Sequence, residues 1–162
     1  MSTEEPDTPV EYQRPKRIIF PPVWLVIGLV IIFVVDQYLP LQRFTGNLAQ
    51  ALGSVAIVAG LLLLVLAGGL FKKADTELIP FREVRALVTD GVYRFTRNPM
   101  YLGMALILLG TACTTGTVAG LLVVPVFMAI IEARFIRPEE EMLRSIFGEE
   151  FDTYCARVRR WL

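Results

Sequence analysis

The sequence predicts an all-α, polytopic membrane protein with about four transmembrane helices, the last two forming a hairpin, and with amphipathic helices outside the membrane. Two observations about composition carry this prediction. Hydrophobic residues make up 54% of the 162 residues, and the mean hydropathy of +0.55 exceeds that of an ordinary soluble domain. A third observation is that the 16 basic and 16 acidic side chains, which sum to zero net charge, are absent from three long stretches.

The first two uncharged stretches are residues 18–35 and 44–71. A spanning helix needs about 20 mostly apolar residues to cross the hydrocarbon core. These stretches therefore predict one span over about 22–38 and another over about 48–71.

The third uncharged stretch, residues 98–131, is too long for one straight span. At 1.5 Å per residue its length would reach about 51 Å. Its middle, residues 111–117, is polar, rich in threonine and contains a glycine, so the chain can turn there. We therefore expect a helical hairpin with arms over about 99–112 and 118–134, the first arm being short enough to tilt or to thin the bilayer.

The basic residues give an orientation. Fifteen of the 16 flank the expected inner ends of the four spans, and only Arg43 lies in an outer connection. The positive-inside rule then places both termini and the long middle loop in the cytoplasm of a bacterial-type inner membrane or its equivalent.

Three segments are expected outside the bilayer. Residues 1–12 are acidic and rich in proline and threonine, which predicts a disordered tail over 1–17 ahead of a single membrane domain over 18–162. Apolar residues recur at helical spacing over 78–88 and predict a short helix on the membrane surface. Region 138–162 has an apolar stripe interrupted at Gly148 and recurrent charges, so we expect a docking helix there and not a fifth span.

The absence of histidine restricts the chemistry. It excludes serine and cysteine nucleophiles that depend on an imidazole, and histidine metal sites. Two cysteines are too few for a zinc site, so no metal is predicted. Cys113 and Cys155 are expected on opposite sides of the membrane, which excludes a disulfide between them. Carboxylates, Arg, Tyr, backbone groups or a cofactor must carry any reaction, and the surroundings are membrane lipids, with no nucleic-acid partner expected.

Two polar clusters meet the inner ends of the hairpin. Residues 91–103 enter the third span and residues 134–141 leave the fourth. If the hairpin closes, the clusters are neighbours beside an apolar wall.

These clusters carry ordered motifs. They read Leu87-Val88-Thr89-Asp90-Gly91-Val92-Tyr93-Arg94, then Arg97-Asn98-Pro99-Met100-Tyr101-Leu102-Gly103, then Glu139-Glu140-Glu141-Met142-Leu143, and finally Phe147-Gly148-Glu149-Glu150-Phe151-Asp152-Thr153-Tyr154. In order and spacing they resemble the isoprenylcysteine carboxyl methyltransferase and phospholipid methyltransferase family of integral membrane enzymes. The resemblance covers residues 87–162. One position departs from the family pattern, since Asn98 stands where the family usually has histidine.

The resemblance implies a methyltransferase that uses S-adenosylmethionine and acts on a small lipophilic acceptor, either an isoprenylcysteine-like carboxylate or a phospholipid amine. The residues that it implies for catalysis are Arg97, Asn98, Arg137 and Glu140. Those that it implies for cofactor binding are Tyr93, Asn98, Pro99, Tyr101, Leu102, Gly103, Glu139 and Glu140. Asn98 cannot carry a proton near neutral pH, so we expect it to orient the cofactor.

Several alternatives stay open. A non-catalytic membrane scaffold or regulator would keep the same fold. A transporter has little support, because the central portions of the four expected spans carry no charge that could serve an ion or proton route. Gly91, Pro99 and Gly103 suit turns and helix packing equally well. Aromatic residues near the chain end, Tyr154 and Trp161, are more typical of an interfacial belt than of a site. Span-end carboxylates such as Glu132 are more typical of a solvated position, and the oligomeric state is left open.

Overall fold

The computed structural model describes residues 20–39, 43, 44, 46–73 and 87–162. The expected tail over residues 1–17 lies outside the described residues, and so does nearly all of the surface helix expected over 78–88.

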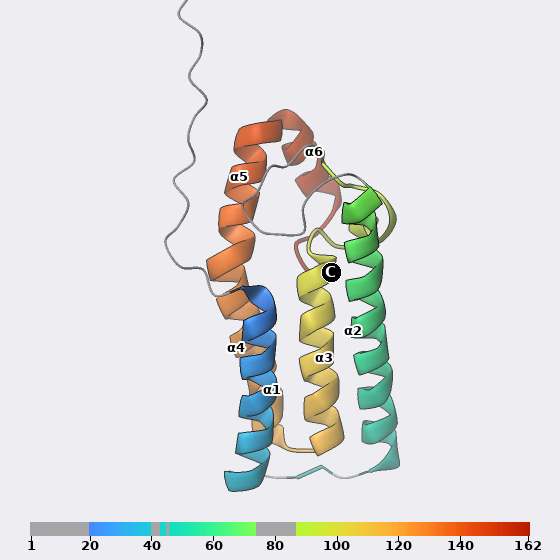
Figure 1. Ribbon diagram of the computed structural model, residues 1–162, viewed down its shortest axis with the longest axis vertical. Helices are drawn as coiled ribbons and strands as arrows, with labels where there is room; N and C mark the ends of the chain where they lie inside the picture. Colours follow the sequence, from blue (N-terminus) through green and yellow to red (C-terminus); the bar gives the residue numbers. More distant parts are fainter. Residues whose placement is uncertain (1–19, 40–42, 45, 74–86) are drawn as a thin grey trace, which may run out of the picture.

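The described residues form a helical bundle whose members alternate in direction, with one helix extending beyond the others (Figure 1). The only strand-like pairing among them is an isolated bridge between Arg43 and Thr117. The elements are α1 (Pro21–Tyr38), α2 (Asn47–Lys73), the 3-10 helix η1 (Gly91–Arg94), α3 (Pro99–Thr115), α4 (Val118–Ile131), the π-helical segment η2 (Glu132–Ile136), α5 (Arg137–Phe147) and α6 (Glu149–Arg157).

The prediction of a polytopic all-α protein is confirmed. Three helical stretches are long and apolar enough to cross a membrane, Pro21–Tyr38, Asn47–Leu70 and Val118–Phe147. The shorter apolar helix α3, with 17 residues, reaches about 26 Å at 1.5 Å per residue. The chain is therefore an integral membrane protein, and α3 and α4 form the expected hairpin.

The helix of the fourth span continues past residue 134, the expected end of the span, because α4 runs through η2 into α5 without a break. Pro138 lies on this continuing helix and has no N–H to donate to the carbonyl of residue 134. The wider π turns over Glu132–Ile136 come shortly before this proline, and the N–H of Arg137 bonds to the Glu132 carbonyl. The helix therefore carries the acidic residues of the second motif on the same rod as the span.

Helix α3 has clear start and stop signals. Pro99 occupies its first turn, where a fixed φ favours helix and a missing N–H costs nothing. Gly116 ends the helix at φ 75°, the left-handed conformation that glycine adopts most easily. The Gly116 carbonyl then accepts a 2.8 Å bond from the N–H of Phe44, which ties the two connections at this end of the bundle together.

Glycines set the contact between α2 and α3. A Cβ placed on Gly60 would lie 2.5 Å from the carbonyl oxygen of Gly103, and one on Gly110 would lie 2.4 Å from that of Gly53. The backbones therefore approach more closely than any side chain would allow. In contrast, Gly68 has nothing within 4 Å of such a Cβ.

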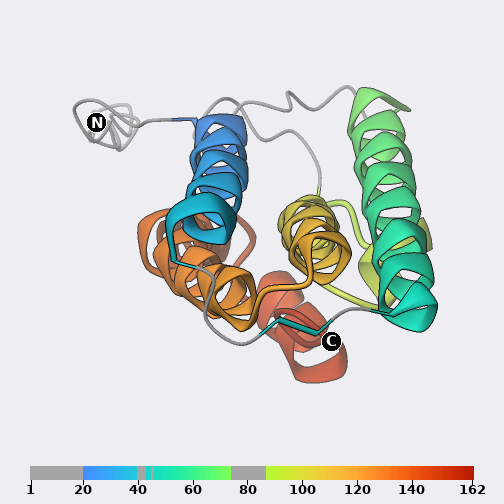
Figure 2. The same ribbon diagram turned by 90° about the horizontal axis from the view of Figure 1, so that it is seen from below.

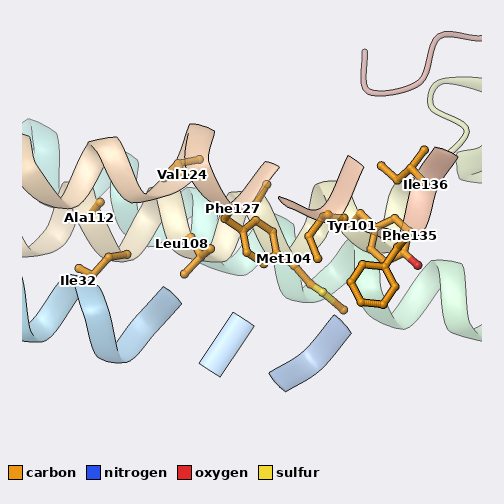
Figure 3. Close-up of a cluster of buried hydrophobic side chains, with 11 residues drawn as sticks. Ile32, Tyr101, Met104, Leu108, Ala112, Val124, Phe127, Phe135 and Ile136 are labelled. Atoms are coloured by element: carbon orange, nitrogen blue, oxygen red, sulfur yellow. The ribbon is translucent and has the colours of Figure 1, made fainter. Parts of the chain in front are cut away.

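The main core lies between α1, α3 and α4 and continues toward the charged end of the bundle (Figures 2 and 3). Ile32 and Leu108 are fully buried in its middle. Nearer the charged end, the rings of Tyr101 and Phe135 lie 6.3 Å apart between centroids. The packed core thus reaches the first polar residues of the motifs and fixes the start of α3 against η2.

Candidate functional site

We call the end of the bundle formed by η1, η2, α5 and α6 the polar end. Here the two motif clusters meet. Nη2 of Arg97, just before α3, donates to Oε1 of Glu140 on α5 at 2.8 Å. The two side chains are only 12% and 10% exposed. The hairpin therefore closes as expected and brings the two charged motifs into direct contact.

Arg97 is held on several sides. Its Nη1 donates to the carbonyls of Cys155 at 3.1 Å and Val158 at 2.8 Å, and its backbone N–H donates to the carbonyl of Arg159 at 3.0 Å. Its Nε is buried and has no acceptor among the described residues. A buried donor without an acceptor is costly, so this nitrogen calls for an acceptor that the described residues do not supply.

Glu140 is neutralised by two guanidinium groups. Besides Arg97, it accepts bonds from Nε of Arg160 at 3.1 Å and from Nη2 of Arg160 at 2.6 Å. Arg160 also donates from Nη1 to Glu132 at 2.9 Å. Glu132 in turn accepts bonds from Nη2 of Arg137 at 3.1 Å and from the indole N–H of Trp161 at 3.2 Å.

Glu139 lies in a different environment from its neighbour. Its carboxylate accepts a 2.7 Å bond from the hydroxyl of Tyr101, and it forms no ion pair with any residue that the structure describes. It is partly buried, whereas Glu141 is exposed. The two adjacent carboxylates on α5 therefore differ, since Glu140 pairs with arginines whereas Glu139 binds a phenol hydroxyl.

Asn98 uses its side-chain amide to hold the chain beyond α6. Nδ2 donates to the carbonyl of Arg160 at 3.0 Å. The same carbonyl accepts a 3.2 Å bond from the hydroxyl of Thr96. Residues 158–161 consequently run across the start of α3, as the position of the chain end in Figure 1 also shows.

Two tyrosines form the wall between η1 and α6. The hydroxyl of Tyr154 donates to the carbonyl of Tyr93 at 2.7 Å, and both rings are buried. Burial raises the pKa of Tyr154 to about 12. Burial also raises the pKa of Tyr93 well above its usual range, and nearby Tyr154 and Glu139 add to the shift. Both phenols are therefore protonated at neutral pH.

A cleft of about 400 Å³ opens beside this wall. It lies between the segment ahead of α3 and the end of α6. Its lining residues are Thr89, Asp90, Arg94, Tyr154, Arg157 and Val158.

Comparison with known proteins identifies the family. The sequence pattern of phospholipid methyltransferases matches residues 48–150, from α2 to the start of α6. The chain belongs to the phospholipid methyltransferase family. Both motif clusters lie inside the matched region, while residues 158–161 lie beyond it.

Individual relatives of this phospholipid methyltransferase family member agree with the assignment. The chain is 33% identical over 72 residues to the protein-S-isoprenylcysteine O-methyltransferase of Schizosaccharomyces pombe, a match that covers 44% of this chain and 30% of that enzyme. It is 41% identical over 63 residues to an uncharacterised protein of Haemophilus influenzae, which covers 39% of this chain and 100% of that protein.

A solved structure shares the fold. The eukaryotic intramembrane Ras methyltransferase ICMT (isoprenylcysteine carboxyl methyltransferase) matches with a TM-score of 0.50 and 23% identity, over 87% of this chain and 51% of that one. The chain thus spans about half of that structure's chain and less than a third of the Schizosaccharomyces pombe enzyme.

Most of the residues that the sequence singled out meet at the polar end. Those that lie there together are Tyr93, Arg97, Asn98, Tyr101, Glu139 and Glu140. Pro99, Leu102 and Gly103 are buried in α3, where Gly103 faces α2. Arg137 is exposed and pairs with Glu132 at 3.1 Å.

Sequence reasoning missed several members of the network. Glu132 is not simply solvated, because it joins Arg160 and Trp161. The expectation that Tyr154 belongs to an interfacial belt is wrong, since its side chain is 6% exposed and bonded to Tyr93. The usable signal was the position of Glu132, the first charge after the long uncharged stretch and eight residues before Glu140 on a continuing helix.

Proposed function

We propose that this protein is a membrane methyltransferase that uses S-adenosylmethionine to methylate a small lipophilic acceptor reaching the site from the bilayer. The observation that carries the proposal is the meeting of Arg97 with Glu140 at the end of an apolar bundle, where Tyr101 also binds Glu139. Membership of a methyltransferase family supplies the reaction class.

The residues of the polar end fit the charged part of this cofactor. The methionine portion of S-adenosylmethionine carries an anionic carboxylate and two cationic groups, an ammonium and a sulfonium. Arg97 offers a buried Nε without an acceptor in the described structure, suited to the carboxylate. Among the described residues, Glu139 has a hydroxyl as its hydrogen-bond partner and no cation, so its carboxylate is suited to one. A donor without an acceptor and a carboxylate without a cation therefore lie on facing elements of the described structure.

Each residue then has a distinct part. Bound S-adenosylmethionine would supply an electrophilic methyl group on a positively charged sulfur. Glu139 would hold the cationic side of the cofactor, with Tyr101 fixing the carboxylate from the core side. Glu140 would hold Arg97 in place, since its own charge is already matched by two guanidinium groups. Methyl transfer depends mainly on alignment, so this fixation is the protein's main contribution.

The acceptor is proposed to be either an isoprenylcysteine-like carboxylate or a phospholipid amine. A carboxylate can accept a methyl group without a base. An amine must first lose its proton, and Glu139 is a carboxylate at the polar end that could accept it. The exposed apolar surfaces of α1 and α2 suit a membrane-dissolved acceptor over a water-soluble one.

Binding of the cofactor tests the proposal directly. Isothermal titration of the purified, folded protein in detergent should show S-adenosylmethionine binding. Glu139→Gln should weaken it about 10-fold or more, the usual cost of losing a charged hydrogen bond. Glu141→Gln is the matched control, because Glu141 is exposed on the same helix, and it should leave the affinity unchanged.

A second measurement tests the reaction. Membranes containing the protein, incubated with radiolabelled methyl donor, should yield a labelled lipid or lipophilic acid on extraction. Folded protein that binds no cofactor and labels nothing would overturn the proposal in favour of a non-catalytic scaffold.

We also propose that the polar end faces the cytoplasm, because it adjoins the chain's basic segments. Single cysteines introduced in a cysteine-free chain test this. Glu141→Cys at the polar end should be shielded from a membrane-impermeant thiol reagent in intact cells, whereas Asn47→Cys at the opposite end should react. The reverse pattern would overturn the orientation.

A further inference from the structure

The segment after α6 is fastened to both motifs by one residue. The side chain of Arg160 binds Glu140 on α5 and Glu132 on η2, at 2.6 Å and 2.9 Å. Its backbone carbonyl accepts bonds from Asn98 and Thr96, at 3.0 Å and 3.2 Å, ahead of α3. Arg160 thus joins the beginning of one hairpin arm to the end of the other.

The neighbours of Arg160 hold the site's key cation. The carbonyls of Val158 and Arg159 accept bonds from Nη1 and the backbone N–H of Arg97. Both carbonyls belong to the extended chain that Arg160 anchors. If that anchor is lost, Arg97 loses two acceptors together with the second guanidinium that balances Glu140.

We propose that Arg160 is a positioning residue that latches residues 158–161 onto the site, and that Asn98 acts by holding the Arg160 carbonyl. The inference rests on the proposed function for its effect on the cofactor, while the latch itself is a property of the folded chain. It explains why an amide can occupy the position where the family usually has histidine. Holding a carbonyl requires one N–H donor, which asparagine and neutral histidine both have, and no proton transfer.

This role predicts a specific order among replacements of Asn98. Asn98→His retains an N–H donor and should keep the latch closed. Asn98→Asp has two acceptor oxygens facing a carbonyl oxygen at neutral pH, so it should open the latch.

The fluorescence of Trp161 reports whether the latch is open or closed, and this readout needs no cofactor. The chain has two tryptophans, so a Trp24→Phe background leaves Trp161 as the single fluorophore. Its indole donates to Glu132 and is partly buried. Opening the latch should shift its emission to longer wavelength and raise its quenching by acrylamide about two-fold.

The experiment measures Trp161 emission, acrylamide quenching and cofactor affinity in detergent for five proteins. These are the Trp24→Phe background and the same chain with Asn98→His, Asn98→Asp, Arg160→Gln or Arg144→Gln. Arg144 is the matched control, because its side chain is 50% exposed and pairs with Asp152 instead of with residues 158–161. Circular dichroism establishes that each protein keeps its helices.

The expected result is that Asn98→Asp and Arg160→Gln open the latch and weaken cofactor binding about 10-fold, while Arg144→Gln matches the background. Asn98→His should restore the Trp161 signal and most of the affinity that Asn98→Asp loses. Should Asn98→Asp fail to fold, Arg160→Gln carries the test.

The outcomes separate the two proposals. If the background protein binds the cofactor and Arg160→Gln changes neither the Trp161 emission nor the affinity, the latch is overturned and the proposed function stands. If the Trp161 emission responds as expected but the proteins bind no cofactor, the latch is supported and the proposed function is overturned.

Discussion

Arg97 and Glu140 are separated by 43 residues in the sequence, yet their side chains meet at 2.8 Å in a nearly solvent-free position. The pair joins the start of α3 to the first turns of α5. Because each partner also binds further groups, its removal affects the whole polar end.

Loss of the Glu140 charge should destabilise the protein strongly. Glu140→Gln leaves Arg97 and Arg160 without their shared anion, and removing one partner of a buried pair typically costs about 3–5 kcal/mol. Asp152→Asn is the control, because it breaks an ion pair with Arg144 whose side chains are 50% and 55% exposed, and such pairs contribute about 1 kcal/mol or less. Equal shifts of the unfolding midpoint in detergent would contradict the buried role of Glu140.

The close glycine contact between α2 and α3 predicts that a side chain larger than that of glycine will not fit there without cost. Gly60→Ala places a methyl group 2.5 Å from the Gly103 carbonyl oxygen, so the helices must separate, at about 1–3 kcal/mol. Gly68→Ala meets open space and should leave the thermal midpoint unchanged or slightly raised. If both variants unfold alike, the close approach of the two helices is not what stabilises the bundle.

The Tyr101 hydroxyl should contribute to stability only through its hydrogen bond to Glu139, because the ring packs in the core with or without the hydroxyl. Tyr101→Phe removes a 2.7 Å bond to the carboxylate and should cost about 1.5 kcal/mol or more. Tyr38→Phe provides the comparison, since Tyr38 is 77% exposed and its hydroxyl should contribute almost nothing. Chemical unfolding of both variants in detergent measures the difference, and a cost at Tyr38 equal to that at Tyr101 would refute it.

The thiol of Cys155 should react slowly. Burial raises its pKa, with Arg97 opposing and Glu140 adding to the shift. A raised pKa means less thiolate at a given pH, so alkylation of a Cys113→Ala chain by iodoacetamide at pH 8 should be slower when folded than when unfolded. The pH at which the rate is half-maximal should likewise be higher in the folded protein. Identical pH profiles for the folded and unfolded chain would show that the thiol is not shielded.

The sequence could predict the spans and the meeting of the two motifs, because both depend on local signals. Uncharged stretches marked α1 and α2, while Pro99 marked the start of α3. The continuation of α4 past Glu132 was not predictable in the same way, because charged residues indicate where a span leaves the membrane, whereas backbone hydrogen bonding decides where a helix stops. The part played by Arg160 depends on how the chain folds back after Gly148, a long-range contact that no periodicity encodes.

The unbroken helix from α4 into α5 has a mechanical consequence. Glu139 and Glu140 are borne by the same rod whose lower half sits among lipid tails, so they cannot shift independently of it. A change in bilayer thickness that tilted this rod would therefore move both carboxylates relative to Arg97.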